Sequence, residues 1–356
     1  MKSRLKNIRK VLALRNINLL LVTDPLNVRY LTGFTGSTGF CLVGKNVAIF
    51  FSDFRYSTQY KKEVYKSFQF IEGNNYFDLI VEQVKRRGFK RLFFEDTNLN
   101  YRNFHLVKKK LGKVKFLPSS GIIDSLRIVK DKKEIAFIRK AASLNSKALS
   151  DLIPKIKSGV SEVELSTNLE NLMKKYGSER NAFDTIVASG VRSALPHGVA
   201  SKKKIKKGNL ITIDFGSVVN GYHADTTRVF SCGEPSKKTR HIYEVVLRSQ
   251  KAAIEKVTPG VKCGEVDAAA RDIIEKEGYG ESFGHGTGHG LGLFIHEGPR
   301  IAPNQDTILK PNMILTIEPG IYIKGWGGVR IEDMILVKNK GKEIITSNIS
   351  KELIVC

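Results

Sequence analysis

Hydrophobic residues in the first third of the chain follow two alternating patterns, one typical of strands and one typical of helices. Short apolar runs at Asn18–Thr23, Val47–Phe51 and Arg91–Glu95 are typical of strands. Between the last two, the stretch Phe77–Arg87 carries its apolar residues at helical spacing and predicts an amphipathic helix. Strands that alternate with helices predict an α/β domain for this part of the chain.

The pattern then changes twice. Pro118 and Gly121 interrupt it, and two capping boxes, Asp131–Glu134 and Ser161–Glu164, predict the starts of two long helices. Beyond about residue 181 the chain becomes rich in strand-like segments, glycine and histidine. A second domain of mixed α and β structure is therefore expected after the first.

Composition places the chain among folded proteins and raises one question about partners. It has 356 residues, 41% of them hydrophobic and 26% charged, with a net charge of +24. Residues 1–130 hold 25 Lys+Arg against 9 Asp+Glu, a net charge of +16. A polyanion partner would therefore be sought in the first domain. The lysine clusters are short and are not interleaved with aromatic residues, so we predict no specific nucleic-acid partner.

The spacing of the cysteines and the length of the apolar runs indicate the cellular compartment of the protein. The four cysteines show no CxxC spacing and are too sparse for a disulfide framework: Cys41, Cys232, Cys263 and Cys356. We interpret them as reduced thiols and predict a cytoplasmic protein. No run approaches 18 apolar residues, so no membrane association is expected.

The first candidate for chemistry is a hairpin around Asn220-Gly221, a dipeptide typical of a type I′ turn. A regular hairpin closed by that turn places Asp214 opposite Thr227 and Asp225 opposite Gly216. The two aspartates then share one face of the sheet, with backbones about 7–8 Å apart. Such a pair suits a shared cation or two cations. The alternative is that both are surface aspartates on an exposed sheet face.

Histidines and glutamates further along extend this set. His285, His289 and His296 fall within twelve residues of a glycine-rich segment, and His197 precedes them in the sequence Leu-Pro-His-Gly. Two alternating segments each place a glutamate within a predicted strand, Glu318 before Pro-Gly and Glu332.

Four carboxylates and one imidazole are thus available: Asp214, Asp225, Glu318, Glu332 and His289. Such a set, without thiolates, favours Mn²⁺, Co²⁺, Fe²⁺ or Zn²⁺. Four carboxylates balance the charge of two divalent ions, for which a bridging hydroxide is the natural nucleophile.

These residues stand in the motifs IDFG, ADTTR, GHGTGHGLG, TIEPG and GVRIED, in that order. The chain thereby resembles the pita-bread metallopeptidases of family M24, of the aminopeptidase P and prolidase type. Two earlier motifs, YLTGFTG at 30–36 and SDFRY at 52–56, resemble the N-terminal domain of such enzymes. The resemblance implies an α/β creatinase-like domain at residues 1–124. An α+β pita-bread catalytic domain would follow at residues 125–356.

The resemblance also implies roles. Asp214, Asp225, His289, Glu318 and Glu332 would hold two divalent ions per subunit, with Mn or Co expected first and Zn or Fe as alternatives. His197 and His296 would contact the substrate and stabilise the tetrahedral intermediate, His285 would bind the proline side, and Glu318 would relay a proton. Thr227 and Arg330 would orient the ligands without touching the metal.

The implied substrates are peptides with proline at the second position, and the implied assembly is a homodimer. We predict an Xaa-Pro aminopeptidase of the aminopeptidase P type. The alternative within the class is an Xaa-Pro dipeptidase, a prolidase restricted to dipeptides. The alternative from another class is a non-catalytic pita-bread binding module, which the intact set of five ligands disfavours.

Overall fold

The computed structural model describes residues 2–356, which form two compact units divided between Arg127 and Ile128. The division expected from the sequence, after residue 124, falls within α6 (Ile122–Arg127), the last helix of the first unit. No helix among the described residues is long and apolar enough to cross a membrane.

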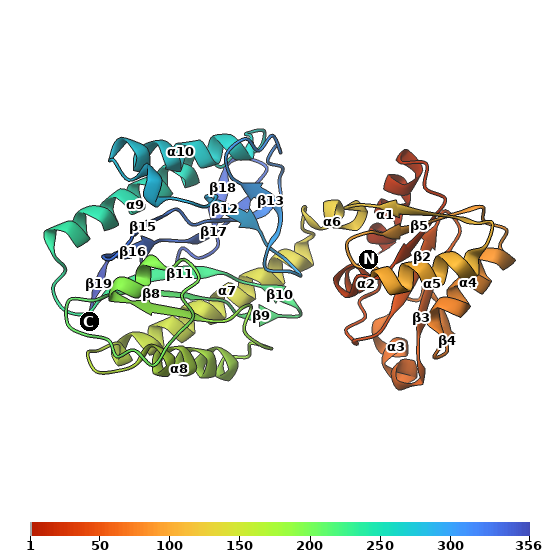
Figure 1. The fold of residues 1–356 in the computed structure, drawn as a ribbon, viewed down its shortest axis with the longest axis horizontal. Helices are drawn as coiled ribbons and strands as arrows, with labels where there is room; N and C mark the ends of the chain where they lie inside the picture. Colours follow the sequence, from red (N-terminus) through yellow and green to blue (C-terminus); the bar gives the residue numbers. More distant parts are fainter. Residues whose placement is uncertain (1) are drawn as a thin grey trace. The chain divides into compact units, whose positions relative to one another are not determined.

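The first unit is built on a six-stranded sheet with the order β4-β3-β2-β1-β5-β6 (Figure 1). β1 pairs in parallel with β5 and antiparallel with β2, so the sheet is mixed. Its strands are β1 (Leu19–Val22), β2 (Phe40–Gly44), β3 (Ala48–Ser52), β4 (Gln69–Glu72), β5 (Arg91–Glu95) and β6 (Lys115–Ser119). Its other helices are α1 (Lys2–Leu14), α2 (Pro25–Thr32), the 3₁₀ helix η1 (Phe54–Tyr56), α3 (Ser57–Glu63), α4 (Tyr76–Arg86) and α5 (Tyr101–Leu111).

Helices α4 and α5 pack against this sheet. Ile80 and Val84 of α4 and Val107 of α5 join one buried cluster with Leu19 and Leu21 of β1. The predicted helix Phe77–Arg87 is thus α4, shifted by one residue, and the α/β character expected from the sequence is confirmed.

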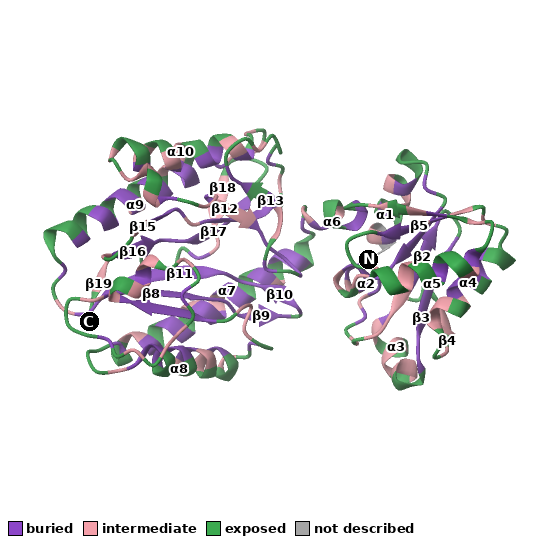
Figure 2. Ribbon diagram, viewed as in Figure 1, coloured by how far each residue is buried: buried purple, intermediate pink, exposed green. Residues whose placement is uncertain are grey.

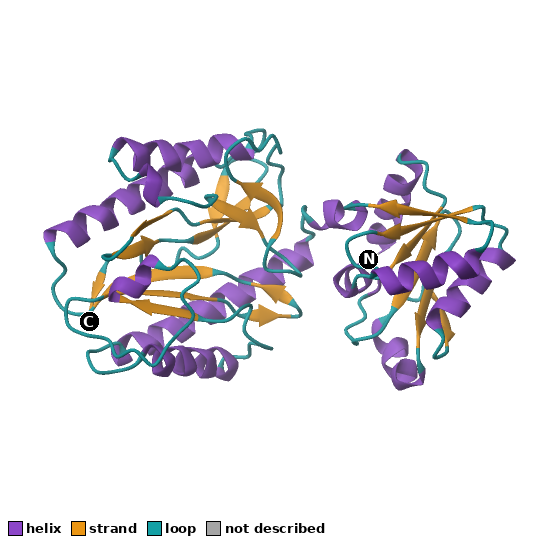
Figure 3. Cartoon of the chain, in the orientation of Figure 1, coloured by secondary structure: helices purple, strands orange, loops and turns teal. Residues whose placement is uncertain are grey.

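The second unit has two sheets with helices on their outer sides (Figure 3). One sheet has the order β19-β11-β8-β7, the other β13-β12-β14-β17-β18, and two ribbons pair β9 with β10 and β15 with β16. The strands are β7 (Ile186–Ser189), β8 (Leu210–Phe215), β9 (Val218–Val219), β10 (Tyr222–His223), β11 (Thr226–Ser231), β12 (Gly288–Gly290), β13 (Glu297–Ile301), β14 (Ile314–Ile317), β15 (Gly320–Ile323), β16 (Gly327–Arg330), β17 (Asp333–Val337), β18 (Lys342–Ile344) and β19 (Ile354–Val355). The helices are α7 (Lys132–Leu152), α8 (Glu162–Lys175), α9 (Lys237–Lys256) and α10 (Cys263–Lys276), with 3₁₀ turns η2 (Ile153–Lys155), η3 (Gly190–Ala194) and η4 (Gly280–Ser282).

Each helix pair covers one sheet. α7 and α8 pack on β8 through a buried cluster that includes Leu149, Leu169 and Ile213. α9 and α10 pack on β14 and β17 through a second cluster that includes Ile254 and Val266. Figure 2 shows β8, β11, β16 and β17, which lie between these helices, as buried, whereas the outer strands β13 and β18 are partly exposed. Polar side chains on the inner faces of the sheets are therefore held inside the unit, where the candidate site lies.

The sequence predicted where α7 and α8 begin, but it did not predict α9 and α10. Both predicted capping boxes are present, with Asp131 and Ser161 as the N-cap residues of α7 and α8. The two long helices α9 and α10 lie in the part of the chain expected to be mainly strands. Helical spacing was visible there, since Ile242, Val245 and Val246 lie on the buried side of α9.

Candidate metal centre

The hairpin that carries the two aspartates has the predicted register. Asp214 on β8 lies opposite Thr227 on β11, and the connecting Asn220 and Gly221 both have positive φ, at 49° and 76°. This confirms the register and a turn with both central residues in the left-handed region. Glycine is needed at position 216, because a Cβ there would lie 2.0 Å from the backbone oxygen of Ala224.

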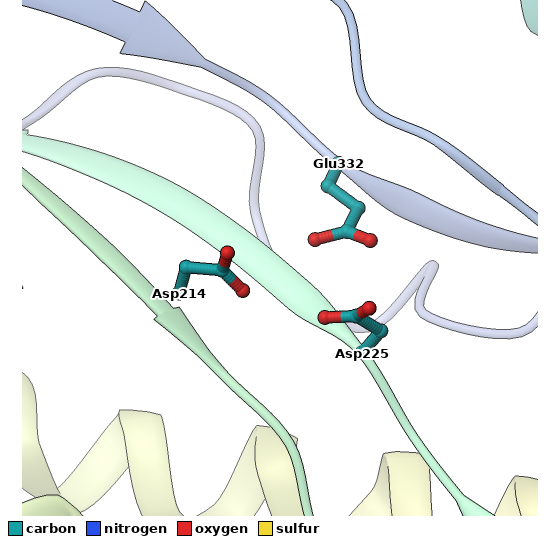
Figure 4. Close-up of side chains that lie close together, drawn as sticks. All are labelled: Asp214, Asp225 and Glu332. Carbon is teal, nitrogen blue, oxygen red and sulfur yellow. The ribbon is translucent and has the colours of Figure 1, made fainter. Parts of the chain in front are cut away.

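Three carboxylates converge where this hairpin faces the second sheet. One ligand oxygen each from Asp214, Asp225 and Glu332 lies within 4.8 Å of the others (Figure 4). The residues are 8%, 5% and 1% exposed, so the alternative of two surface aspartates is wrong. One oxygen of each carboxylate is buried without a hydrogen-bond partner. Buried charges without partners are costly, so this donor set fits a bound cation.

Electrostatics supports the same conclusion. Burial raises the pKa of Asp225 well above its usual value, and the carboxylates of Glu332, Asp214 and Glu318 raise it further. Burial, Glu318 and Asp214 likewise raise the pKa of Glu332. The cluster therefore resists full ionisation by itself, and a divalent cation would remove that resistance.

Glu318 and Glu332 lie at strand ends, whereas the sequence placed each within a strand. Glu318 follows β14, whose ladder with β17 ends at the pair Ile317 and Asp333. Glu332 occupies the junction between β16 and β17. Because neither residue takes part in a ladder, the backbone N–H of Glu318 donates to the carbonyl of Thr287 at 2.7 Å, and that of Glu332 donates to Thr227 at 3.3 Å.

His289 and Glu318 lie beside the three carboxylates. His289 Nε2 is 3.3 Å from Glu318 Oε1 and 3.7 Å from Asp225 Oδ2. Burial raises the pKa of Glu318, but the hydrogen bond and charge of His289 outweigh it and lower that pKa to about 2. The five ligands expected from the sequence are thus close together, with Asp214, Asp225 and Glu332 forming the tightest group.

The other three candidate histidines, His197, His285 and His296, line the same cavity, which has a volume of about 1050 Å³. His285 Nε2 is 2.9 Å from the Tyr322 hydroxyl, and burial lowers the pKa of His285. The ring of His296 lies 4.6 Å from that of His289, and burial followed by the charge of His289 lowers the pKa of His296. His197 lines the cavity on the loop after η3.

Thr227 and Arg330 contact two of the candidate ligands directly. The Thr227 hydroxyl donates to Glu332 Oε2 at 2.8 Å, and Arg330 Nη2 donates to Asp214 Oδ2 at 2.6 Å. Arg330 Nε also donates to the Thr227 hydroxyl at 3.2 Å. Arg330 is only 4% exposed, so it is not part of a surface ion pair. These contacts fix one oxygen of Asp214 and one of Glu332 and leave the other available to a cation.

Sequence reasoning missed three residues of the site region. Asp267 on α10 holds the loop before His289 in place, because the Thr287 hydroxyl donates a hydrogen bond to its carboxylate at 2.7 Å. Tyr322 bridges His285 and Arg330. Arg300 lies on β13 opposite His289 and lines the cavity. The only signal for Arg300 was its position four residues after His296, which does not distinguish it from the other basic residues.

Comparison with known proteins gives the family. The model of metallopeptidase family M24 matches residues 136–339, and that of the creatinase/prolidase N-terminal domain matches residues 4–129. The chain belongs to metallopeptidase family M24. It is therefore a hydrolase, and the creatinase-like and pita-bread architecture expected from the resemblance is confirmed.

Relatives within family M24 cover nearly the whole chain. An Xaa-Pro dipeptidase from Pyrococcus furiosus is 40% identical over 97% of this chain and 98% of that protein. The structure of an Xaa-Pro dipeptidase from Bacillus anthracis is 42% identical, covers 100% of this chain and 99% of its own, and has a TM-score of 0.97. An X-Pro aminopeptidase from Thermotoga maritima is 36% identical, with coverages of 98% and 100% and a TM-score of 0.90.

Membership of family M24 implies divalent metal ions, and the buried acidic cluster is consistent with them. The relatives also bear on the choice between the two activities. They support the Xaa-Pro dipeptidase alternative better than the Xaa-Pro aminopeptidase preferred from the sequence, with which they remain compatible.

Proposed function

We propose that this M24 enzyme hydrolyses the Xaa-Pro bond of dipeptides. The observation that carries the proposal is Arg300, an exposed residue of the cavity wall whose backbone pairs with that of His289. Directly opposite residues in a ladder project to the same face of a sheet, so Arg300 shares the face of His289. Among the described residues Arg300 has no ion pair or side-chain hydrogen bond. It is thus free to bind a carboxylate.

A dipeptide presents such a carboxylate one residue beyond the scissile bond, whereas a longer peptide has an amide there. A cation at that distance from the catalytic groups favours the dipeptide by direct pairing. The names of the Pyrococcus furiosus and Bacillus anthracis relatives agree with this choice.

The five residues that would hold two divalent ions are Asp214, Asp225, His289, Glu318 and Glu332. Mn²⁺ or Co²⁺ is our first choice because the donors are oxygens with one imidazole nitrogen, and Zn²⁺ or Fe²⁺ would also be accepted. Such ions supply Lewis-acid polarisation of the scissile carbonyl and of water. Metal analysis of the purified protein tests this part; two equivalents per chain are expected, and no binding of any of the four ions would refute it.

The remaining side chains supply hydrogen bonds and proton transfer. Because burial lowers the pKa of His296, its ring is neutral near pH 7 and donates one N–H to the developing oxyanion, together with His197. Glu318, with a pKa of about 2, is ionised and accepts the proton of the attacking water before passing it to the proline nitrogen. His285, held by Tyr322, contacts the proline side of the substrate.

The deciding experiment compares an Xaa-Pro dipeptide, its C-terminal amide and an Xaa-Pro-Yaa tripeptide with Mn²⁺- or Co²⁺-loaded enzyme. We expect cleavage of the dipeptide to be favoured. Arg300→Gln should raise KM for the dipeptide about 10–100-fold, because it removes one charge-assisted hydrogen bond to the substrate carboxylate. Its kcat/KM for the amide should not change.

Arg240→Gln provides the matched control, since Arg240 is an exposed arginine paired with Glu234 outside the cavity. Its kinetics should equal those of the wild type. Preferred cleavage of the tripeptide, with no effect of Arg300→Gln on the dipeptide, would overturn the dipeptidase proposal in favour of the aminopeptidase.

We further propose that the enzyme is a homodimer, as the resemblance implies. Sedimentation velocity should give one species of twice the chain mass, and a monomer at micromolar concentration would contradict this.

A further inference from the structure

Two cysteines meet where the end of the described chain joins the first sheet of the second unit. β19 pairs in parallel with β11, with Phe230 opposite Ile354 and Ser231 opposite Val355. Cys232 and Cys356 are the next residues on the two strands. Both are free thiols in the structure.

Backbone hydrogen bonds continue the pairing through these cysteines. The N–H of Cys356 donates to the carbonyl of Ser231 at 2.8 Å, and the N–H of Gly233 donates to the carbonyl of Cys356 at 2.8 Å. These two bonds, to the residues on either side of Cys232, are the pattern that places two residues opposite each other in a parallel ladder. Opposed residues of neighbouring strands lie about 4.8 Å apart, within the Cα separation of about 4.4–6.8 Å found in disulfides.

Their side chains also share one environment. Cys232 belongs to the hydrophobic cluster beneath β8 and β11, and Cys356 packs against the same cluster. Burial and the adjacent Cys232 thiol raise the pKa of the Cys356 thiol. Cys356 is partly exposed, whereas Cys41, Cys232 and Cys263 are buried, so an oxidant in solution reaches Cys356 first.

We propose that Cys232 and Cys356 are a modification site that a low-molecular-weight disulfide oxidises to an intrachain disulfide. The Cys356 thiolate attacks one sulfur of the oxidant and expels one small thiolate. The Cys232 thiolate then attacks Sγ of Cys356, forms the new bond and expels the second small thiolate. Each protein thiol gives up one proton to solvent, and the two released thiols carry the two electrons.

The new bond would fasten a segment that already supports the metal-ligand region. Arg228 on β11 donates to the carbonyls of Ile349 and Ser350, at 2.9 and 2.8 Å, and also to the carbonyl of Glu332. Lys351 forms an ion pair with Asp333 at 3.0 Å. Linking Cys356 to Cys232 closes a long loop around these contacts, which restricts the unfolded chain more than the folded one.

The test treats the full-length protein with glutathione disulfide at about pH 8, with a parallel sample kept reduced. The oxidised protein should lose two of its four thiols and the mass of two hydrogens. Peptide mapping should recover Cys232 linked to Cys356. Its Tm should rise by about 5–10 °C relative to the reduced sample, and reduction should reverse the shift.

Two variants serve as controls. Cys41→Ala, which removes a thiol of the first unit, should still lose two thiols, whereas Cys356→Ser should lose none to an intrachain bond. Four remaining thiols in the oxidised wild type, a stable glutathione adduct on Cys356, or a disulfide between other cysteines would overturn the proposal. The peptide map of the wild type decides this even if a variant does not fold.

Discussion

The ion pair of Asp267 and Arg271 on α10 offers a strong test of how the loop that carries His285, a proposed substrate contact, is held in place. Asp267 is 1% exposed and accepts four hydrogen bonds, two from Thr287 at 3.0 and 2.7 Å and two from Arg271 at 2.8 and 3.0 Å. Arg271 in turn donates to the carbonyls of Phe283 and His285 at 3.1 and 2.8 Å. The pair therefore fixes the backbone on both sides of His285.

The perturbation is Asp267→Asn, which keeps the shape of the side chain but removes its charge and one acceptor. Breaking a buried ion pair from one side costs about 3–5 kcal/mol. The Arg271 side chain is 19% exposed, so water can replace part of the lost contact, and we expect a loss of about 2–4 kcal/mol in the free energy of unfolding. Glu234→Gln breaks an ion pair of 2.6 Å to Arg240 whose side chains are 81% and 52% exposed, and should change stability by less than about 1 kcal/mol.

Activity should fall as well, because the loop carries His285 and because the carbonyl of Thr287 accepts the N–H of Glu318 at 2.7 Å. A displacement of about 1 Å in such groups lowers kcat/KM by roughly 10²-fold. Urea denaturation and dipeptide hydrolysis of wild type, Asp267→Asn and Glu234→Gln measure both effects. If Asp267→Asn is destabilised yet keeps kcat/KM within two-fold of wild type, the pair does not position the proposed catalytic groups. Unchanged stability would refute the burial argument itself.

Three further predictions concern single side chains. Asp225→Asn should stabilise the metal-free protein by about 1–3 kcal/mol at pH 7 while abolishing turnover. The reason is that burial and neighbouring carboxylates raise the pKa of Asp225, so the folded state disfavours its ionised form. A variant that is less stable in urea denaturation would contradict this. Burial raises the pKa of Glu95 to about 7 despite hydrogen bonds from Thr23 and Asp24, so its contribution to stability is full below about pH 4.5 and is lost as pH rises to about 7, by up to about 3 kcal/mol. The difference in unfolding free energy between wild type and Glu95→Gln, measured from pH 4 to pH 8, should follow that window, and a constant difference would rule it out. Tyr322→Phe removes the hydroxyl that contacts His285 and should lower kcat/KM about ten-fold with a stability change of about 1 kcal/mol; wild-type kinetics would show that the contact is dispensable.

Sequence alone predicted the features that depend on neighbouring residues. The capping box at Asp131 located the start of α7, the run Arg91–Glu95 is the whole of β5, and Asn220-Gly221 set the register that pairs Asp214 with Thr227. In each case the signal and the structure lie within about twenty residues of chain. α9 carried a comparable signal, with Ser236 as its N-cap, but the prediction treated all of the chain beyond about residue 181 as mainly strands.

Contacts across the two sheets could not be predicted in the same way. Alternation and motif order made Asp225 and Glu332 candidate ligands, but they did not predict that the two carboxylates lie within 4.8 Å of each other, because 107 positions (332 minus 225) separate them in the sequence. The hydrogen bond from Thr287 to Asp267 joins the predicted glycine-rich segment to α10, a helix that was not predicted. Arg300 was one of 59 basic residues, and only its place opposite His289 supports the role proposed for it.

The buried carboxylates also connect function with stability. In the metal-free protein Asp214, Asp225 and Glu332 oppose folding, because burial raises the pKa of each of them. A cation that binds only the folded state adds RT ln(1 + [L]/Kd) to stability, about 2.7 kcal/mol at a hundred-fold excess over Kd. Asp225→Asn should therefore invert the ranking: more stable than wild type without metal, and less stable than wild type with saturating Mn²⁺ or Co²⁺. The inversion separates a cation-binding cluster from an ordinary buried acidic one, because a cluster that binds no cation gives the same ranking in both conditions.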